Sequence, residues 1–70
     1  MIIPNYRGYT IQTDCYKNEA GWFPRYHLTN LITGEEGTIA PRCSYTTEVE
    51  AIRESLKFAA QAIRRQEVGF

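Results

Sequence analysis

The feature that most constrains the fold is a long amphipathic segment over residues 46–66. Its apolar residues recur at helical spacing and form one stripe about 100° wide. The stripe consists of Val49, Ile52, Leu56, Ala59, Ala60 and Ile63. A helix of this length is marginal in water by itself, so the stripe needs a partner surface. We therefore expect the rest of the chain to form a sheet that covers it.

Local signals mark both ends of this helix. Thr47 followed by Glu50 is a capping box, in which the hydroxyl accepts from a backbone N–H of the first turn. Acidic residues lie in the first turn and Arg64 lies near the last, which is the order that the helix dipole favours. Gly69 is the expected stop. These signals predict one helix over residues 46–66.

Phe58 lies about 180° from the predicted core direction. We expect it to be exposed, either as a single apolar side chain that touches Phe70 or as a contact for a partner or a second copy. A basic flank lies beside the stripe, and we expect it to be solvated and paired with nearby glutamates. The flank consists of Arg53, Lys57 and Arg64.

Three segments before the helix have strand-like patterns: residues 6–16, 22–32 and 38–45. Residues 1–5 are expected to be an irregular lead-in, because Pro4 discourages regular structure. Pro41 indicates that the third predicted strand lies at an edge of the sheet.

Cross-strand pairs predict the register of the first hairpin. Setting Arg25 opposite Asp14 in an antiparallel pair also sets Tyr16 opposite Phe23 and Leu28 opposite Ile11. The three pairs are ionic, aromatic and apolar, and each such pair stabilises a sheet by about 0.2–1 kcal/mol.

The second hairpin is predicted from a two-residue turn at Gly34 and Glu35. This turn places Leu28 opposite Pro41, Tyr26 opposite Cys43, and His27 opposite Arg42. The predicted fold class is therefore α+β: a single two-layer βββα domain over residues 1–70. Its three-stranded antiparallel meander, in the order 1-2-3, packs on one C-terminal helix and leaves its other face open.

Several short motifs support this plan. They are the strand start Tyr6-Arg7-Gly8-Tyr9, Trp22 with Tyr26, the turn at Gly34, and the junction Tyr45-x-Thr47-x-x-Glu50-Ala51. Together they resemble short uncharacterised bacterial proteins with three strands and one helix. The plan is also similar to the fold of HicB-like antitoxins and to part of the double-stranded-RNA-binding domain. The resemblance implies the fold alone, because the motifs mark a strand-to-helix junction.

Composition narrows the classes of function. The formal net charge is zero and 43% of residues are hydrophobic, which is typical of a globular domain without the basic footprint of most nucleic-acid binders. No apolar run approaches a membrane span, and the amino end lacks the pattern of a signal peptide, so we expect a cytoplasmic protein that does not enter membranes.

The sequence offers little for catalysis. The one histidine, His27, is expected beside Gln12 and Arg42, where it finds no nucleophile. Cys15 and Cys43 are expected to be small buried hydrophobes on separated strands, too far apart for a disulfide. We therefore predict no enzyme, no cofactor and no metal site.

The candidate binding residues are Phe23, Arg25, His27 and Arg42 on the open sheet face, and Phe58 on the helix. We predict a non-catalytic interaction module that binds a protein partner or associates with itself as a weak homodimer. The alternative is a nucleic-acid-binding module that uses the open sheet face, with bases stacked on aromatic rings and arginine on phosphate. The outer face has a third interpretation, in which Arg25 only pairs with Asp14 and Phe23 only packs on Tyr16.

Overall fold

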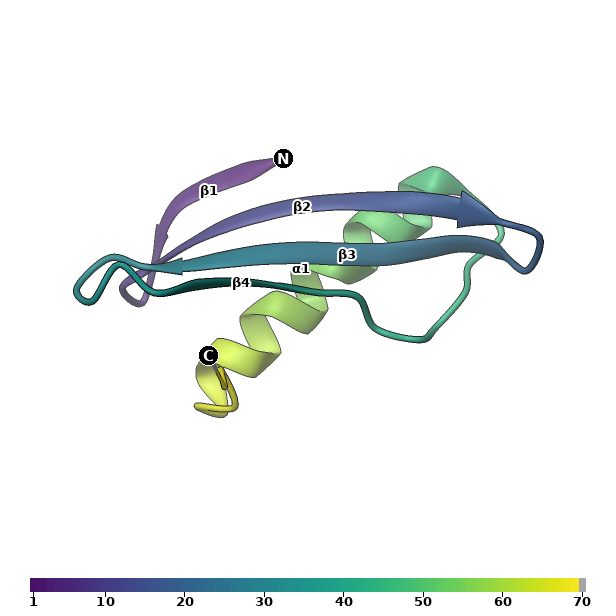
Figure 1. Ribbon diagram of the computed structural model, residues 1–70. Helices are drawn as coiled ribbons and strands as arrows, with labels where there is room; N and C mark the ends of the chain where they lie inside the picture. Colours follow the sequence, from purple (N-terminus) through teal and green to yellow (C-terminus); the bar gives the residue numbers. More distant parts are fainter. Residues whose placement is uncertain (70) are drawn as a thin grey trace.

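The computed structural model describes residues 1–69 and has two layers, an antiparallel sheet and one C-terminal helix on one of its faces (Figure 1). The elements are β1 (Ile2–Tyr6), β2 (Tyr9–Asn18), β3 (Gly21–Asn30), β4 (Glu36–Ile39) and α1 (Glu48–Arg64). The strands lie in the order β1-β2-β3-β4. The α+β class and the helix after the sheet are confirmed, but the sheet has four strands where three were predicted.

The additional strand is β1, which forms where an irregular lead-in was expected. A tight turn at Arg7 and Gly8 folds the chain back, and both residues have positive φ, 51° and 90°. This geometry suits the right-handed twist of a two-residue hairpin. Pro4 has no backbone N–H to donate. It is tolerated in β1 because an edge strand pairs with a neighbouring strand on one side only. The predicted strand over residues 6–16 is therefore interrupted at the turn.

The hairpin of β2 and β3 has the predicted register. Asp14 lies opposite Arg25, and Tyr16 lies opposite Phe23. Ile11 lies opposite Leu28, and both side chains are completely buried beneath α1. The prediction succeeded because these facing pairs carry their own pattern of charge, aromaticity and burial.

The predicted register of the second hairpin is wrong by four residues. Leu28 lies opposite Gly37, and His27 lies opposite Thr38. The cause is Asn30, whose Oδ1 accepts from the backbone N–H groups of Ile32 and Thr33 at 2.8 and 3.1 Å. This Asx turn begins the loop earlier than the predicted Gly34-Glu35 turn.

The strand predicted over residues 38–45 is also mostly wrong, because β4 ends at Ile39. Pro41 follows two residues later and cannot donate to a ladder. The chain then leaves the sheet and returns at Tyr45, which exchanges two backbone hydrogen bonds with Trp22 of 2.7 and 2.9 Å. Cys43 lies in the released segment and is exposed, whereas Cys15 is half-buried; both are free thiols. The prediction that both are buried is therefore wrong.

The amino end of α1 agrees with the sequence. Thr47 is the N-cap, and its hydroxyl accepts from the N–H of Glu50 at 3.2 Å. The carboxyl end differs, because Gln66 takes the left-handed conformation with φ 55° and Glu67 donates to the Ala62 carbonyl at 2.9 Å. This Schellman-type cap ends the helix before the predicted Gly69 stop. No helix in the described part of the chain has the length and apolarity to cross a membrane.

The buried face of α1 is rotated from the predicted stripe. Its buried residues recur every fourth position and are mostly small: Ala51, Ser55, Ala59 and Ile63. Small side chains let the helix approach β2 and β3 closely, and the sheet supplies the bulk through Ile11, Tyr26 and Leu28. The rotation exposes Val49, which was predicted to be buried and is 64% exposed.

The same rotation turns Phe58 toward the sheet. Phe58 is half-buried and packs against the core cluster that contains Ile11 and Leu28. The prediction that Phe58 is exposed on the side of α1 away from the core is therefore wrong. Its predicted neighbour, Phe70, lies outside the described residues.

Candidate functional site

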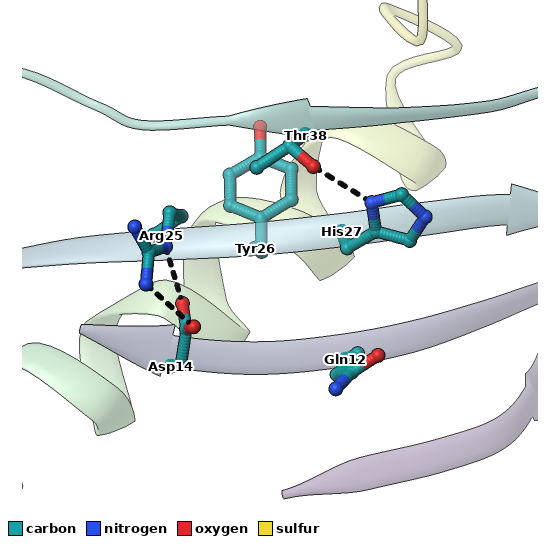
Figure 2. A pocket seen from close by; sticks show the side chains of 6 residues that line it. All are labelled: Gln12, Asp14, Arg25, Tyr26, His27 and Thr38. Atoms are coloured by element: carbon teal, nitrogen blue, oxygen red, sulfur yellow. Dashed lines mark hydrogen bonds and ion pairs between the residues drawn. The ribbon is translucent and has the colours of Figure 1, made fainter.

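The sheet face opposite α1 carries three of the predicted binding residues, Phe23, Arg25 and His27. They share a face because their positions along β3 differ by two. A shallow depression of about 380 Å³ lies on this face (Figure 2). It is lined by Gln12, Asp14, Arg25, Tyr26, His27 and Thr38.

Arg25 is held by partners within the sheet. Its Nε and Nη2 donate to the two carboxylate oxygens of Asp14, each at 2.8 Å, as Figure 2 shows. These hydrogen bonds lower the pKa of Asp14, although partial burial opposes the shift, and they raise the pKa of Arg25. The guanidinium also lies 5.5 Å from the centre of the Tyr16 ring, which stacks on Phe23 at 5.4 Å. Arg25, Tyr16 and Phe23 thus form one continuous stack.

His27 has different neighbours from those predicted. Its Nδ1 lies 2.7 Å from the hydroxyl of Thr38, and its Nε2 lies 3.3 Å from a carboxylate oxygen of Glu36. Gln12 lies opposite His27 as expected, but Arg42 does not. Thr38 and Glu36 were missed because the second hairpin register was displaced.

The Thr38 hydroxyl, the His27 imidazole and the Glu36 carboxylate lie in the same order as the groups of a catalytic triad. Efficient catalysis of that kind also needs a site that excludes water and stabilises the developing charge. Here the Glu36 side chain is 63% exposed and that of His27 is 30% exposed. These two side-chain contacts therefore act mainly as a link between β3 and β4.

Two of the five predicted binding residues do not join this face. Arg42 is exposed in the segment that follows β4, away from the paired strands. Phe58 belongs to the helix layer on the opposite side of the sheet. The cluster of Phe23, Arg25, His27 and Arg42 is thus only partly assembled.

The ion pair of Asp14 and Arg25 predicts a specific dependence of stability on pH. The folded pKa of Asp14 lies below its ordinary value of 3.8. Its contribution is therefore present above that value and is lost as the pH falls through the folded pKa. Because both side chains are exposed, we expect Asp14→Asn to lower the free energy of unfolding by only about 0.2–1 kcal/mol near pH 7. The difference should be smaller at about pH 2 than at pH 7, because the carboxylate becomes protonated as the pH falls.

Urea unfolding of both proteins at the two pH values measures this difference. Glu19→Gln is a matched control, because Glu19 is exposed and forms no ion pair with residues 1–69. A gap between wild type and Asp14→Asn that is unchanged at low pH would contradict the assignment.

A second surface was missed by the sequence interpretation. It is an exposed apolar strip on the flank of α1 next to β1, which we call the α1–β1 strip. Met1 is 62% exposed and Val49 is 64% exposed. Ile52 and Leu56 are half-buried and, with Met1, Val49 and Arg53, line a shallow groove. The strip consists of Met1, Val49, Ile52 and Leu56.

The position of α1 explains why this strip is uncovered. The helix packs on β2 and β3, whereas β1 curves along the edge of the sheet (Figure 1). The apolar residues of α1 span a wider arc than the sheet covers, so Val49 and the outer side of Leu56 remain accessible. The sequence did contain a signal for this surface, namely more large apolar residues on the helix than the small buried face accommodates.

No protein-family model, curated protein or solved structure matches this chain. The similarity to HicB-like antitoxins and to the double-stranded-RNA-binding domain therefore stays a prediction from the motifs.

Proposed function

We propose that this protein is a non-catalytic interaction module that associates with a second copy of itself through the α1–β1 strip. The exposed apolar side chains of Met1 and Val49, with Ile52 and Leu56 beside them, carry the proposal. Contiguous apolar surface of this kind is typical of sites that bury against another protein. A second copy offers the same apolar surface, as a two-fold symmetric contact requires.

The charges around the strip complement one another across a two-fold axis. Arg53 lines the groove and forms no ion pair with the other residues between 1 and 69. Glu48 and Glu50 lie in the first turn of the same helix. An antiparallel contact between two copies of α1 brings Arg53 of each copy toward the acidic first turn of the other. Such complementarity favours one orientation more than it raises affinity.

The size of the strip implies weak association. It has four apolar side chains, two of them already half-buried, which fall short of the roughly 800 Å² per partner of a stable complex. We therefore expect a dissociation constant of about 10–1000 µM.

Extension of the sheet is the less favourable route to a dimer. On one edge, β1 has five residues and contains Pro4, which cannot donate to a new strand. On the other edge, β4 has only four residues and is followed closely by Pro41. Short strands and proline are common protections against edge pairing. The helix flank remains as the contact surface.

The alternative nucleic-acid role has less support from these contacts. Asp14 neutralises Arg25, and Arg42 lies apart from the stack of Tyr16 and Phe23. Arg25 is therefore already paired, which weakens any contact that it could make with the phosphate backbone of a nucleic acid.

Sedimentation velocity between about 5 µM and 2 mM tests the proposal, a range chosen to bracket the expected dissociation constant. Val49→Glu should weaken dimerisation at least tenfold, because it places a carboxylate in an apolar contact. The variant should still fold, since glutamate is favoured in the first turn of a helix.

Gln61→Glu is the matched control, because it adds the same charge at an exposed position of α1 outside the strip. A wild-type protein that stays monomeric at the highest concentration would refute the proposal. Equal dimerisation of Val49→Glu and wild type would also refute it.

A further inference from the structure

We propose that the hollow between the β1–β2 turn and the end of α1 binds the phosphate group of a small phosphate monoester. The hollow has a volume of about 410 Å³. It is lined by Arg7, Tyr9, Ile63, Arg64, Gln66 and Val68. It lies at the opposite end of α1 from Val49, so the inference is independent of the proposed dimer contact.

Two arginine side chains give the hollow a positive charge, which the partial negative charge at the carboxyl end of α1 opposes only in part. Arg7 and Arg64 are distant in sequence and both line it, and neither forms an ion pair with the residues between 1 and 69. No acidic residue is among those that line it. The outer-face depression differs, because Asp14 already neutralises its arginine. Two guanidinium groups can bind phosphate through parallel N–H···O bonds.

The backbone points to the same place. Arg7 and Gln66 are the two residues other than glycine with positive φ in the described chain, at 51° and 55°, and both line the hollow. The hairpin turn and the helix cap account for these conformations, but glycine or asparagine adopts them at lower cost. The turn geometry explains the backbone. The guanidinium of Arg7 lies 5.9 Å from the centre of the Tyr6 ring, a contact that leaves its positive charge available to an anion.

The remaining lining residues define the class of ligand. The hydroxyl of Tyr9 and the amide of Gln66 are hydrogen-bond donors for phosphate oxygens. Ile63 and Val68 form an apolar wall beside them. A hollow of about 410 Å³ accommodates more than a phosphate ion. We therefore expect a phosphate monoester with an apolar body to bind more tightly than inorganic phosphate.

Amide chemical-shift titrations of the intact protein test this site, with inorganic phosphate and phenyl phosphate as probes. Sodium chloride holds the ionic strength constant, and the protein concentration stays well below that of dimerisation. Saturable shifts are expected around Gly8 and Gln66. Arg7→Gln and Arg64→Gln should each weaken binding about tenfold or more, because each removes a charged fork.

Arg65→Gln is the matched control, since Arg65 is the next residue in the chain and does not line the hollow. It should bind phenyl phosphate as wild type does. Non-saturable shifts, or an equal loss in Arg65→Gln and Arg64→Gln, would overturn the site. Equal affinity for both probes would overturn the apolar wall. Repeating the titration on Val49→Glu separates this result from the dimer, because the titration should be unchanged in that variant.

Discussion

Replacement of Leu28 by alanine is expected to lower the free energy of unfolding by about 2–5 kcal/mol. Leu28 is completely buried, lies opposite Ile11 and is part of the core cluster beneath α1. The substitution removes buried apolar surface and leaves a cavity that the closely packed neighbours fill only in part. A chain of 70 residues has a small core, so this loss is a large part of its total stability.

Urea unfolding followed by circular dichroism measures the effect, with Leu31→Ala as the matched control. Leu31 undergoes the same chemical change but is 50% exposed in the loop after β3. We expect the control to change stability by less than about 0.5 kcal/mol. Similar losses in both variants would contradict the position of the core.

Gly21→Ala is expected to have the second largest effect, a loss of about 2–4 kcal/mol. Gly21 has φ 125°, a conformation that side chains disfavour. A Cβ at this position would lie 2.9 Å from the backbone oxygen of Tyr45. That oxygen accepts the N–H of Trp22 at 2.9 Å, so the methyl group would push apart the bridge that anchors the segment before α1.

Gly34→Ala separates the effect of φ from that of the close contact. Gly34 also has a positive φ, 78°, but nothing lies within 4 Å of a Cβ built there. We expect its loss to be only about 1–2 kcal/mol, which is the cost of the left-handed conformation. Thermal unfolding of both variants gives the comparison. A loss at Gly34 as large as that at Gly21 would show that the Tyr45 contact carries no cost.

The outer sheet face shows how far residue pairs can be predicted. Arg25 with Asp14, and Tyr16 with Phe23, were expected from the sequence and are present in the structure. The contacts of His27 were not, because they depend on where the next loop begins. Asn30 sets that position with side-chain hydrogen bonds to the loop, and its effect is local but outweighs the apparent Gly34 turn signal.

The alternation of residue types along the strands and the Thr47–Glu50 capping box determined the β2–β3 hairpin, the start of the helix and the order of sheet and helix. These features depend on neighbours in sequence or on directly facing pairs, which a pattern records. Only the tertiary structure decided the rotation of α1, because several of its faces are apolar and the sheet selects the one with small residues. That choice exposes the α1–β1 strip. The chain fold also decided that Arg7 and Arg64 meet at one hollow, since nothing local links residues so far apart.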